Sequence, residues 1–258
     1  MKKLKDVAIQ ILSVTIIMVI MLSISVSGMT VVKAAENYNG GWAFNKSNGT
    51  AVYSSSNGTT VIGSIGREGI TVLSVSGTTY YIEYSTSSGA KRGYIINPSL
   101  DTSMISNTCV AKVNYNSTTY YGPNTSTYVI AGSVGAGEYV SVLAKEGSWV
   151  YVEYNTTSGR KRGYMLYANL SCYNRPQYFP DFYMTNGQEG TVYATSIKSI
   201  YAGPNDSSYA YVGYIDSNDG ACPLYYSYLY GNGEAFHYIE YYTSSGKKKS
   251  GFIRWDVY

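Results

Sequence analysis

One motif occurs three times in this chain and strongly limits the folds it can adopt. The copies read YYIEYSTSSGAKRGYI at residues 80–95, VYVEYNTTSGRKRGYM at 150–165 and HYIEYYTSSGKKKSGFI at 237–253. In each copy an alternating apolar and polar run precedes a Ser/Thr-Ser-Gly turn and a basic segment, a pattern typical of a β-hairpin. Because the hairpin recurs along the chain, the sequence predicts several small folding units instead of one large core.

The composition favours β-structure in all of these units. The chain has 31 tyrosines and 27 glycines, but only five phenylalanines and three tryptophans. Gly-Pro-Asn turns at 122–124 and 203–205 precede the second and third hairpins. Each unit reads as about five short strands, which must close on themselves to bury a core and remove their edges. We therefore expect an all-β protein of three tandem small barrels.

The N-terminus has the layout of an export signal. A basic start, MKKLKD, precedes an apolar run at 7–26 and small residues that end at Ala34 and Ala35. This layout predicts a signal peptide over residues 1–35, with cleavage after Ala34 or Ala35. The apolar run is long enough to span a bilayer, so an uncleaved membrane anchor is the alternative. Either way, we expect the rest of the chain outside the cytoplasm.

The charge balance gives no support for a nucleic-acid partner. Removing residues 1–35 takes away four of the 19 basic and one of the 16 acidic residues, which leaves 15 of each and no net charge. A membrane partner is expected only if the N-terminal segment is kept. Eight of the 15 remaining basic residues lie in the three repeated turns: Lys91, Arg92, Arg160, Lys161, Arg162, Lys247, Lys248 and Lys249.

The repeats predict the domain boundaries. We expect the first unit at 41–100, the second at 108–171, a linker at 172–190 and the third at 191–258. Cys109 and Cys172 flank the second unit, where the ends of a small barrel would meet. A disulfide between them and three separate thiols are both open readings in an exported protein, and the disulfide would leave Cys222 over.

The second unit also carries a family resemblance. Its Gly-Pro-Asn turn, GEYVSVL and GSWVYVEY strands and RGYMLYANL ending resemble the bacterial SH3-like (SH3b) domain. Trp149 and the segment 163–165 lie at the family's tryptophan and Gly-aromatic positions. The other two units match best in their closing halves, where Thr79 and Phe236 replace the tryptophan. The resemblance implies SH3-like barrels that bind bacterial cell-wall material.

The sequence offers no set of catalytic residues, and we expect no enzyme, metal site or cofactor. The single histidine, His237, aligns with ordinary strand positions, and three scattered cysteines have no metal-ligand spacing. The repeated glutamates Glu83, Glu153 and Glu240 occur once per unit. Lysine or arginine partners across the same hairpin are the expected explanation for them.

The candidate ligand-binding residues come from the repeated hairpins. Tyrosine rings stack on sugars and peptides, and basic side chains attract phosphate and carboxylate groups. The alternative is that the tyrosines pack the barrels and the basic turns are merely solvated. The candidates are Tyr84, Arg92, Trp149, Tyr154, Arg160, Lys161, Arg162, Tyr241 and Lys248.

The sequence thus predicts an exported, non-catalytic binding protein, either secreted or associated with the cell wall. The expected partner is a bacterial cell-wall polymer, peptidoglycan or teichoic acid. The alternative is a secreted module that recognises a protein or peptide at a cell surface. Three weak sites on one chain would combine by raising the effective concentration.

Overall fold

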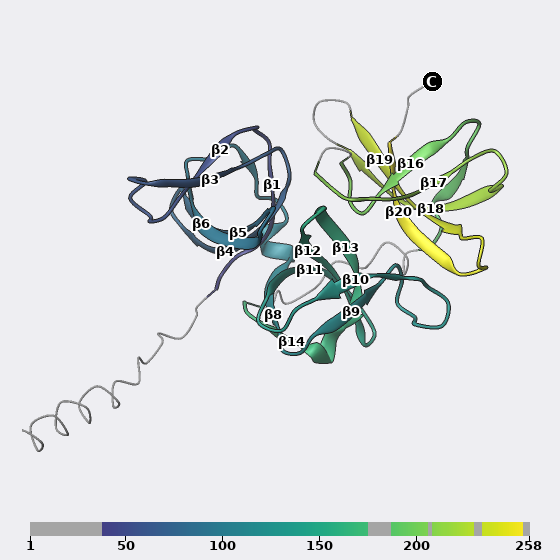
Figure 1. Ribbon diagram of the computed structural model, residues 1–258, viewed down its shortest axis with the longest axis horizontal. Coiled ribbons are helices and arrows are strands. Elements are labelled where there is room, and N and C mark those ends of the chain that lie inside the picture. The colour runs from purple at the N-terminus through teal and green to yellow at the C-terminus, as the bar shows by residue number, and fades with distance from the viewer. Residues whose placement is uncertain (1–37, 175–186, 206–207, 230–233, 255–258) are drawn as a thin grey trace, which may run out of the picture. The chain divides into compact units, whose positions relative to one another are not determined.

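The described residues fold into three antiparallel β-sheets that follow one another along the chain (Figure 1). The computed structural model describes residues 38–174, 187–205, 208–229 and 234–254. The predicted signal peptide with Ala34 and Ala35, and most of the predicted linker, lie outside this part of the chain. Within it, no helix is long and apolar enough to cross a membrane.

The first sheet has the strand order β3-β2-β6-β5-β4-β1-β7, and a 3₁₀ turn, η1 (Ile105–Asn107), follows it. Its strands are β1 (Gly41–Asn45), β2 (Thr50–Tyr53), β3 (Val61–Ile65), β4 (Gly69–Ser76), β5 (Thr79–Thr86), β6 (Gly89–Ile96) and β7 (Leu100–Asp101).

The second sheet has the order β10-β9-β13-β12-β11-β8-β14, with the 3₁₀ turn η2 (Tyr167–Asn169) before its last strand. Its strands are β8 (Cys109–Val113), β9 (Ser117–Tyr120), β10 (Ile130–Val134), β11 (Tyr139–Glu146), β12 (Trp149–Thr156), β13 (Gly159–Leu166) and β14 (Leu170–Cys172).

The third sheet has the order β15-β18-β19-β20-β16-β17. Its strands are β15 (Gly190–Tyr193), β16 (Lys198–Tyr201), β17 (Tyr211–Ile215), β18 (Ala221–Leu229), β19 (Ala235–Tyr242) and β20 (Lys248–Arg254).

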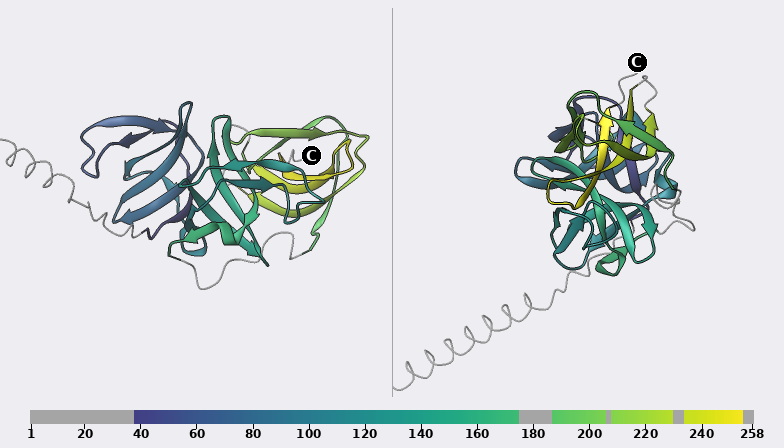
Figure 2. Two further views of the ribbon diagram at one scale, coloured as in Figure 1. Left: turned by 60° about the horizontal axis from the view of Figure 1, so that its bottom comes forward. Right: turned by 90° about the vertical axis from the view of Figure 1, so that its right-hand side faces the viewer.

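The three sheets share one topology. Strand by strand, the first two orders are identical, and the third is the same order without an equivalent of β7. In each sheet the register shifts at the same place of the central strand pair, for example between Val72 and Ser74 and between Val142 and Ala144. Figures 1 and 2 show each sheet strongly curved into a barrel-like form. The all-β fold with three tandem antiparallel units is therefore confirmed.

The hairpin turn explains the Thr-x-Ser-Gly part of the motif. The glycines Gly89 and Gly159 have φ of 106° and 111°, values that side-chain-bearing residues rarely adopt. The hydroxyl of Thr86 donates a hydrogen bond of 2.7 Å to the Gly89 carbonyl, and Thr156 bonds Gly159 in the same way. The threonine thus closes the turn across which the basic segment pairs back.

The repeated tyrosines belong to the cores of the sheets. Tyr84, Tyr154 and Tyr241 are 2%, 0% and 6% exposed. Each phenol oxygen lies against a glycine of the edge strand, where a Cβ would approach to 2.6, 2.8 and 2.6 Å. These glycines are Gly63, Gly132 and Gly213. The prediction that these three tyrosines stack on a ligand is therefore wrong, because their rings are covered by their own sheets.

The buried phenol groups differ in their hydrogen bonds, which gives a matched pair of substitutions. The Tyr154 hydroxyl lies 2.7 Å from the Thr119 hydroxyl, whereas the Tyr84 hydroxyl has no hydrogen-bond partner among the described residues. We expect Tyr154→Phe to lower the free energy of unfolding by about 1 kcal/mol, and Tyr84→Phe to leave it nearly unchanged. Urea unfolding of both variants checks this. If both substitutions changed the free energy of unfolding equally, the difference in hydrogen bonding between the two phenol groups would be contradicted.

Candidate functional site

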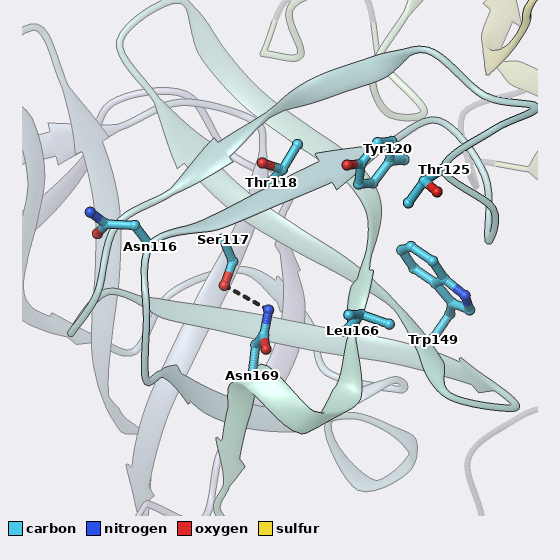
Figure 3. A pocket seen from close by; sticks show the side chains of 8 residues that line it. All are labelled: Asn116, Ser117, Thr118, Tyr120, Thr125, Trp149, Leu166 and Asn169. Carbon is cyan, nitrogen blue, oxygen red and sulfur yellow. Dashed lines mark hydrogen bonds between the residues drawn. The ribbon is translucent and has the colours of Figure 1, made fainter.

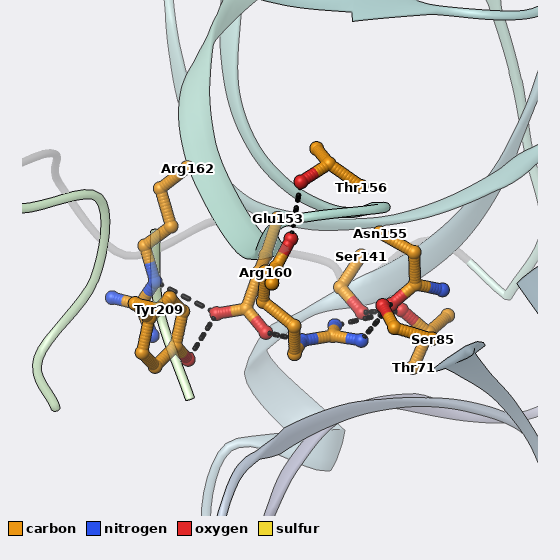
Figure 4. A network of polar contacts seen from close by, with 10 residues as sticks. Thr71, Ser85, Ser141, Glu153, Asn155, Thr156, Arg160, Arg162 and Tyr209 are labelled. Atoms are coloured by element: carbon orange, nitrogen blue, oxygen red, sulfur yellow. Dashed lines mark hydrogen bonds and ion pairs between the residues drawn. The ribbon is translucent and has the colours of Figure 1, made fainter. Parts of the chain in front are cut away.

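The basic turn of the second sheet is buried around one carboxylate. Glu153 accepts hydrogen bonds from Arg160 Nε at 2.6 Å, Arg162 Nε at 2.8 Å and the Tyr209 hydroxyl at 2.7 Å (Figure 4). Glu153 and Arg160 are 0% exposed and Arg162 is 4% exposed. Two guanidinium groups and a phenol therefore surround the carboxylate in the interior.

The outer end of Arg160 extends this network to the first sheet. Its Nη1 donates to Asn155 Oδ1 at 2.5 Å and its Nη2 to Thr71 Oγ1 at 3.3 Å. Ser141 also donates to Thr71, at 3.0 Å, and Ser85 donates to Asn155 at 2.8 Å. Thr71 and Ser141 lie opposite the repeated glutamate in their own sheets. The two sheets thus meet through equivalent residues.

Arg162 is enclosed by aromatic rings from the first and third sheets. Its guanidinium carbon lies 5.2 Å from the ring centre of Trp42, 5.5 Å from that of Phe252 and 5.7 Å from that of Tyr209. Ring faces attract cations, and this attraction grows when water is excluded. The charge of Arg162 is therefore satisfied inside the protein.

Glu153 keeps its charge in this setting. Burial opposes ionisation, but the guanidinium groups of Arg160 and Arg162 outweigh it and hold the pKa of Glu153 below its ordinary value. For Glu83 burial prevails over Arg92, so the pKa of Glu83 is raised. The same residue at the same place in two sheets thus has opposite shifts.

The glutamates of the other two sheets form ion pairs as well. Glu83 accepts from Arg92 at 2.9 Å, and Glu240 accepts from Lys248 at 2.5 Å. The expectation that basic partners lie across the same hairpin is confirmed. Arg92 also stacks over the Tyr139 ring at 4.5 Å. The side chains of Arg92 and Lys248 stay 35% and 26% exposed.

These contacts correct the hypothesis of an anionic polymer site for the basic turn of the second sheet. Arg160 and Arg162 are buried ion-pair partners and cannot reach a polymer at the surface. Lys161 is half-buried and its ammonium donates to the Ala131 carbonyl at 3.3 Å. The reason for the burial is packing between sheets, which no single hairpin sequence can reveal.

A pocket of about 170 Å³ opens beside Trp149, the one predicted aromatic that stays partly exposed at a cavity (Figure 3). Trp149 begins β12, and its ring meets Tyr120 of β9 edge-on at 5.8 Å between centroids. The other lining residues are Asn116, Ser117, Thr118, Thr125, Leu166 and Asn169.

The pocket combines an aromatic wall with neutral polar groups. The amide of Asn169 donates to the Ser117 hydroxyl at 3.1 Å (Figure 3). Thr118 and Thr125 are exposed residues. No charged side chain lines it. Such a surface can stack on an apolar face and exchange hydrogen bonds with hydroxyl or amide groups.

Sequence reasoning identified Trp149 but missed the residues that complete this pocket. Tyr120, Leu166 and Asn169 come from three segments that only the sheet order brings together. The one usable indication was the tyrosine pair just before the Gly-Pro-Asn turn. In the third sheet the equivalent residue, Phe236, is 1% exposed and packs in a core.

The remaining chemistry-bearing side chains have structural surroundings. Cys109 and Cys172 are thiols on the paired strands β8 and β14, with no disulfide between them. His237 lies in β19, where its Nδ1 is 2.8 Å from the Ser227 hydroxyl and burial lowers its pKa. Among the described residues, no group of three or more His, Cys, Asp or Glu side chains is arranged to hold a metal ion.

Comparison with known proteins gives little further information. No family model matches the sequence, and no curated protein matches it. Two solved structures were matched, NlpC2 and NlpC1 from Trichomonas vaginalis, each with 14% identity over 83% of this chain. The matches cover 97% and 92% of those chains, with a TM-score of 0.24 in both cases. At this similarity they carry no argument about this protein.

The buried carboxylate predicts a large difference between equivalent substitutions. Glu153→Gln leaves two buried guanidinium groups without their counter-charge and should lower the free energy of unfolding by about 3–5 kcal/mol. Glu83→Gln affects one partly exposed arginine, so we expect about 1 kcal/mol or less. Chemical unfolding of the two variants side by side tests this, and similar losses would contradict the described network.

The lowered pKa of Glu153 also predicts a pH dependence. The contribution of its ion pairs is complete above the pKa of the unfolded chain, about 4.3, and is lost as the pH falls below it. Between about pH 5 and pH 3, the wild type should therefore lose more stability than Glu153→Gln. Thermal unfolding across this range measures it, and parallel pH profiles would exclude the proposed role.

Proposed function

We propose that this protein is an exported, non-catalytic binding protein that attaches to bacterial cell-wall polymer, and that the pocket beside Trp149 is its principal contact. The observation that carries the proposal is the partly exposed Trp149–Tyr120 pair at the wall of a cavity in the unit that most resembles an SH3-like domain. The export of the chain follows from the predicted signal peptide.

The chemistry of the pocket favours one of the two wall polymers. Teichoic acids carry a phosphate in each unit, and phosphate recognition uses arginine or lysine. The lining has only hydroxyl, amide, aliphatic and aromatic groups. These groups suit the sugar rings and amides of peptidoglycan, because rings stack on sugar faces and neutral polar groups bond hydroxyls. Peptidoglycan is therefore the proposed ligand.

Wall sedimentation with a tryptophan variant tests this function. Trp149→Ala should weaken binding of residues 36–258 to purified cell walls about tenfold, since an aromatic contact contributes about 1–1.5 kcal/mol. Trp149→Phe should retain most of the binding, and Tyr193→Ala, which removes a ring that is 69% exposed elsewhere, should retain all of it. Thermal unfolding of each variant controls for folding.

The ligand class is tested in the same assay. Binding should persist on walls stripped of teichoic acid and should change little with salt, since the pocket holds no charge. If Trp149→Ala bound cell walls as tightly as the wild type, the pocket could not be the principal contact. Binding that disappears with the teichoic acid would contradict the choice of peptidoglycan.

A further inference from the structure

The second and third sheets bind each other through two equivalent loops, one from each sheet. The loop between β16 and β17 lies along β13 with its residues 208–210, where the Arg160 N–H donates to the Ser208 carbonyl and the Ala210 N–H donates to the Arg160 carbonyl, both at 3.0 Å. The loop at 121–129 lies along β20 in the same way. The Val129 N–H donates to the Lys248 carbonyl at 3.0 Å, and the Lys248 N–H donates to the Thr127 carbonyl at 2.9 Å.

Near its end, each of these two loops has a tyrosine that reaches the buried glutamate of the other sheet. Tyr209 donates to Glu153 at 2.7 Å, and Tyr128 donates to Glu240 at 2.5 Å. Both loops contain a Gly-Pro-Asn turn near their start, before the extended segment. In both sheets the outward edge of the basic strand thus forms main-chain hydrogen bonds with an extended segment of a loop. We call this edge the receiving edge, residues 159–162 of β13 and 248–250 of β20.

The first sheet has the same receiving edge. Asn155 pairs with Arg160 in the second sheet, and Ser85 pairs with Ala90 in the first, so Ala90 is the equivalent of Arg160. Strand β6 pairs with β2 only at Tyr94 and is open at 89–92. Within the described part of the chain, no backbone hydrogen bond joins this open segment to a loop. Ala90, Lys91 and Arg92 are exposed.

The first sheet does not carry a loop of the binding type. Its loop at 54–60 is two residues shorter than the one at 121–129, and it has neither the Gly-Pro-Asn turn nor the terminal tyrosine. Its ends are joined to each other by the Ser54 N–H bond to the Thr60 carbonyl. The first sheet therefore retains the receiving edge but lacks a binding loop. In a twofold contact each copy would have to place such a loop on the edge of the other, so this argues against a second copy as the partner.

We propose that the edge of β6 at residues 89–92 binds an extended acidic peptide segment of another protein by β-strand addition. Main-chain bonds to Ala90 and Arg92 would supply the affinity, as they do at the two occupied edges. Arg92 is already paired with Glu83, so the exposed ammonium group of Lys91 selects an acidic neighbour. This surface is separate from the pocket beside Trp149 and takes a different class of ligand.

The chain itself supplies the probe. A peptide with the sequence of residues 201–212, capped at both ends, contains the loop that occupies β13 and one aspartate. Titrated into ¹⁵N-labelled protein of residues 36–258, it should shift the amide signals of Lys91 and Arg92, with a dissociation constant on the order of 1 mM because a linear peptide must be ordered on binding.

Two substitutions remove one main-chain donor each. Ala90→Pro removes the outward N–H from the protein, at an edge position where proline is tolerated, and Ala210→Pro removes the matching donor from the peptide. Each should weaken binding at least fivefold. The peptide variant leaves the protein untouched, so its result holds even if Ala90→Pro fails to fold.

Several results would overturn the proposal. These are the absence of shifts at 89–92, full binding by the Ala210→Pro peptide, or shifts confined to the pocket residues. Concentration-dependent shifts at 89–92 without peptide would mean that a second copy occupies the edge, and would overturn the assigned partner. Trp149→Ala should bind the peptide as the wild type does, which separates this inference from the proposed function.

Discussion

The buried carboxylate of Glu153 connects residues of all three sheets. Arg160 bonds it and reaches Thr71 of the first sheet, while Tyr209 of the third sheet donates to it directly. Arg162 bonds it and lies against Trp42 and Phe252. A buried charge that loses one of its partners costs several kcal/mol, so these partners must stay together. The network explains why a basic turn can be among the least exposed parts of the chain.

The same hairpin therefore has three surroundings. In the second and third sheets it receives a loop of the other sheet, in the second its arginines are also buried, and in the first it keeps an open edge. This difference arises from neighbours and not from the hairpin, because each copy keeps the glutamate and a basic partner. The site that we propose for wall polymer is instead the pocket beside Trp149, where the lining side chains are neutral.

The fold was accessible from the sequence, since alternation, turn residues and a threefold repeat are local signals. The ion pairs of the glutamates were accessible too, because partners across a hairpin are set by register. The burial of Tyr154 and Arg160 could not be predicted from the sequence. A tyrosine on a strand and an arginine beside a turn suit a surface as well as an interior, and the choice depends on contacts between sheets. The pocket was missed for the same reason, because Tyr120 and Asn169 meet Trp149 only after the sheet has formed.

Differential scanning calorimetry of residues 36–258 tests most directly whether the sheets form one unit around Glu153. The account predicts a single transition near neutral pH, in which the van't Hoff enthalpy equals the calorimetric enthalpy. Two or three separate transitions, each with the enthalpy of one small sheet, would show that the sheets unfold independently and would contradict it.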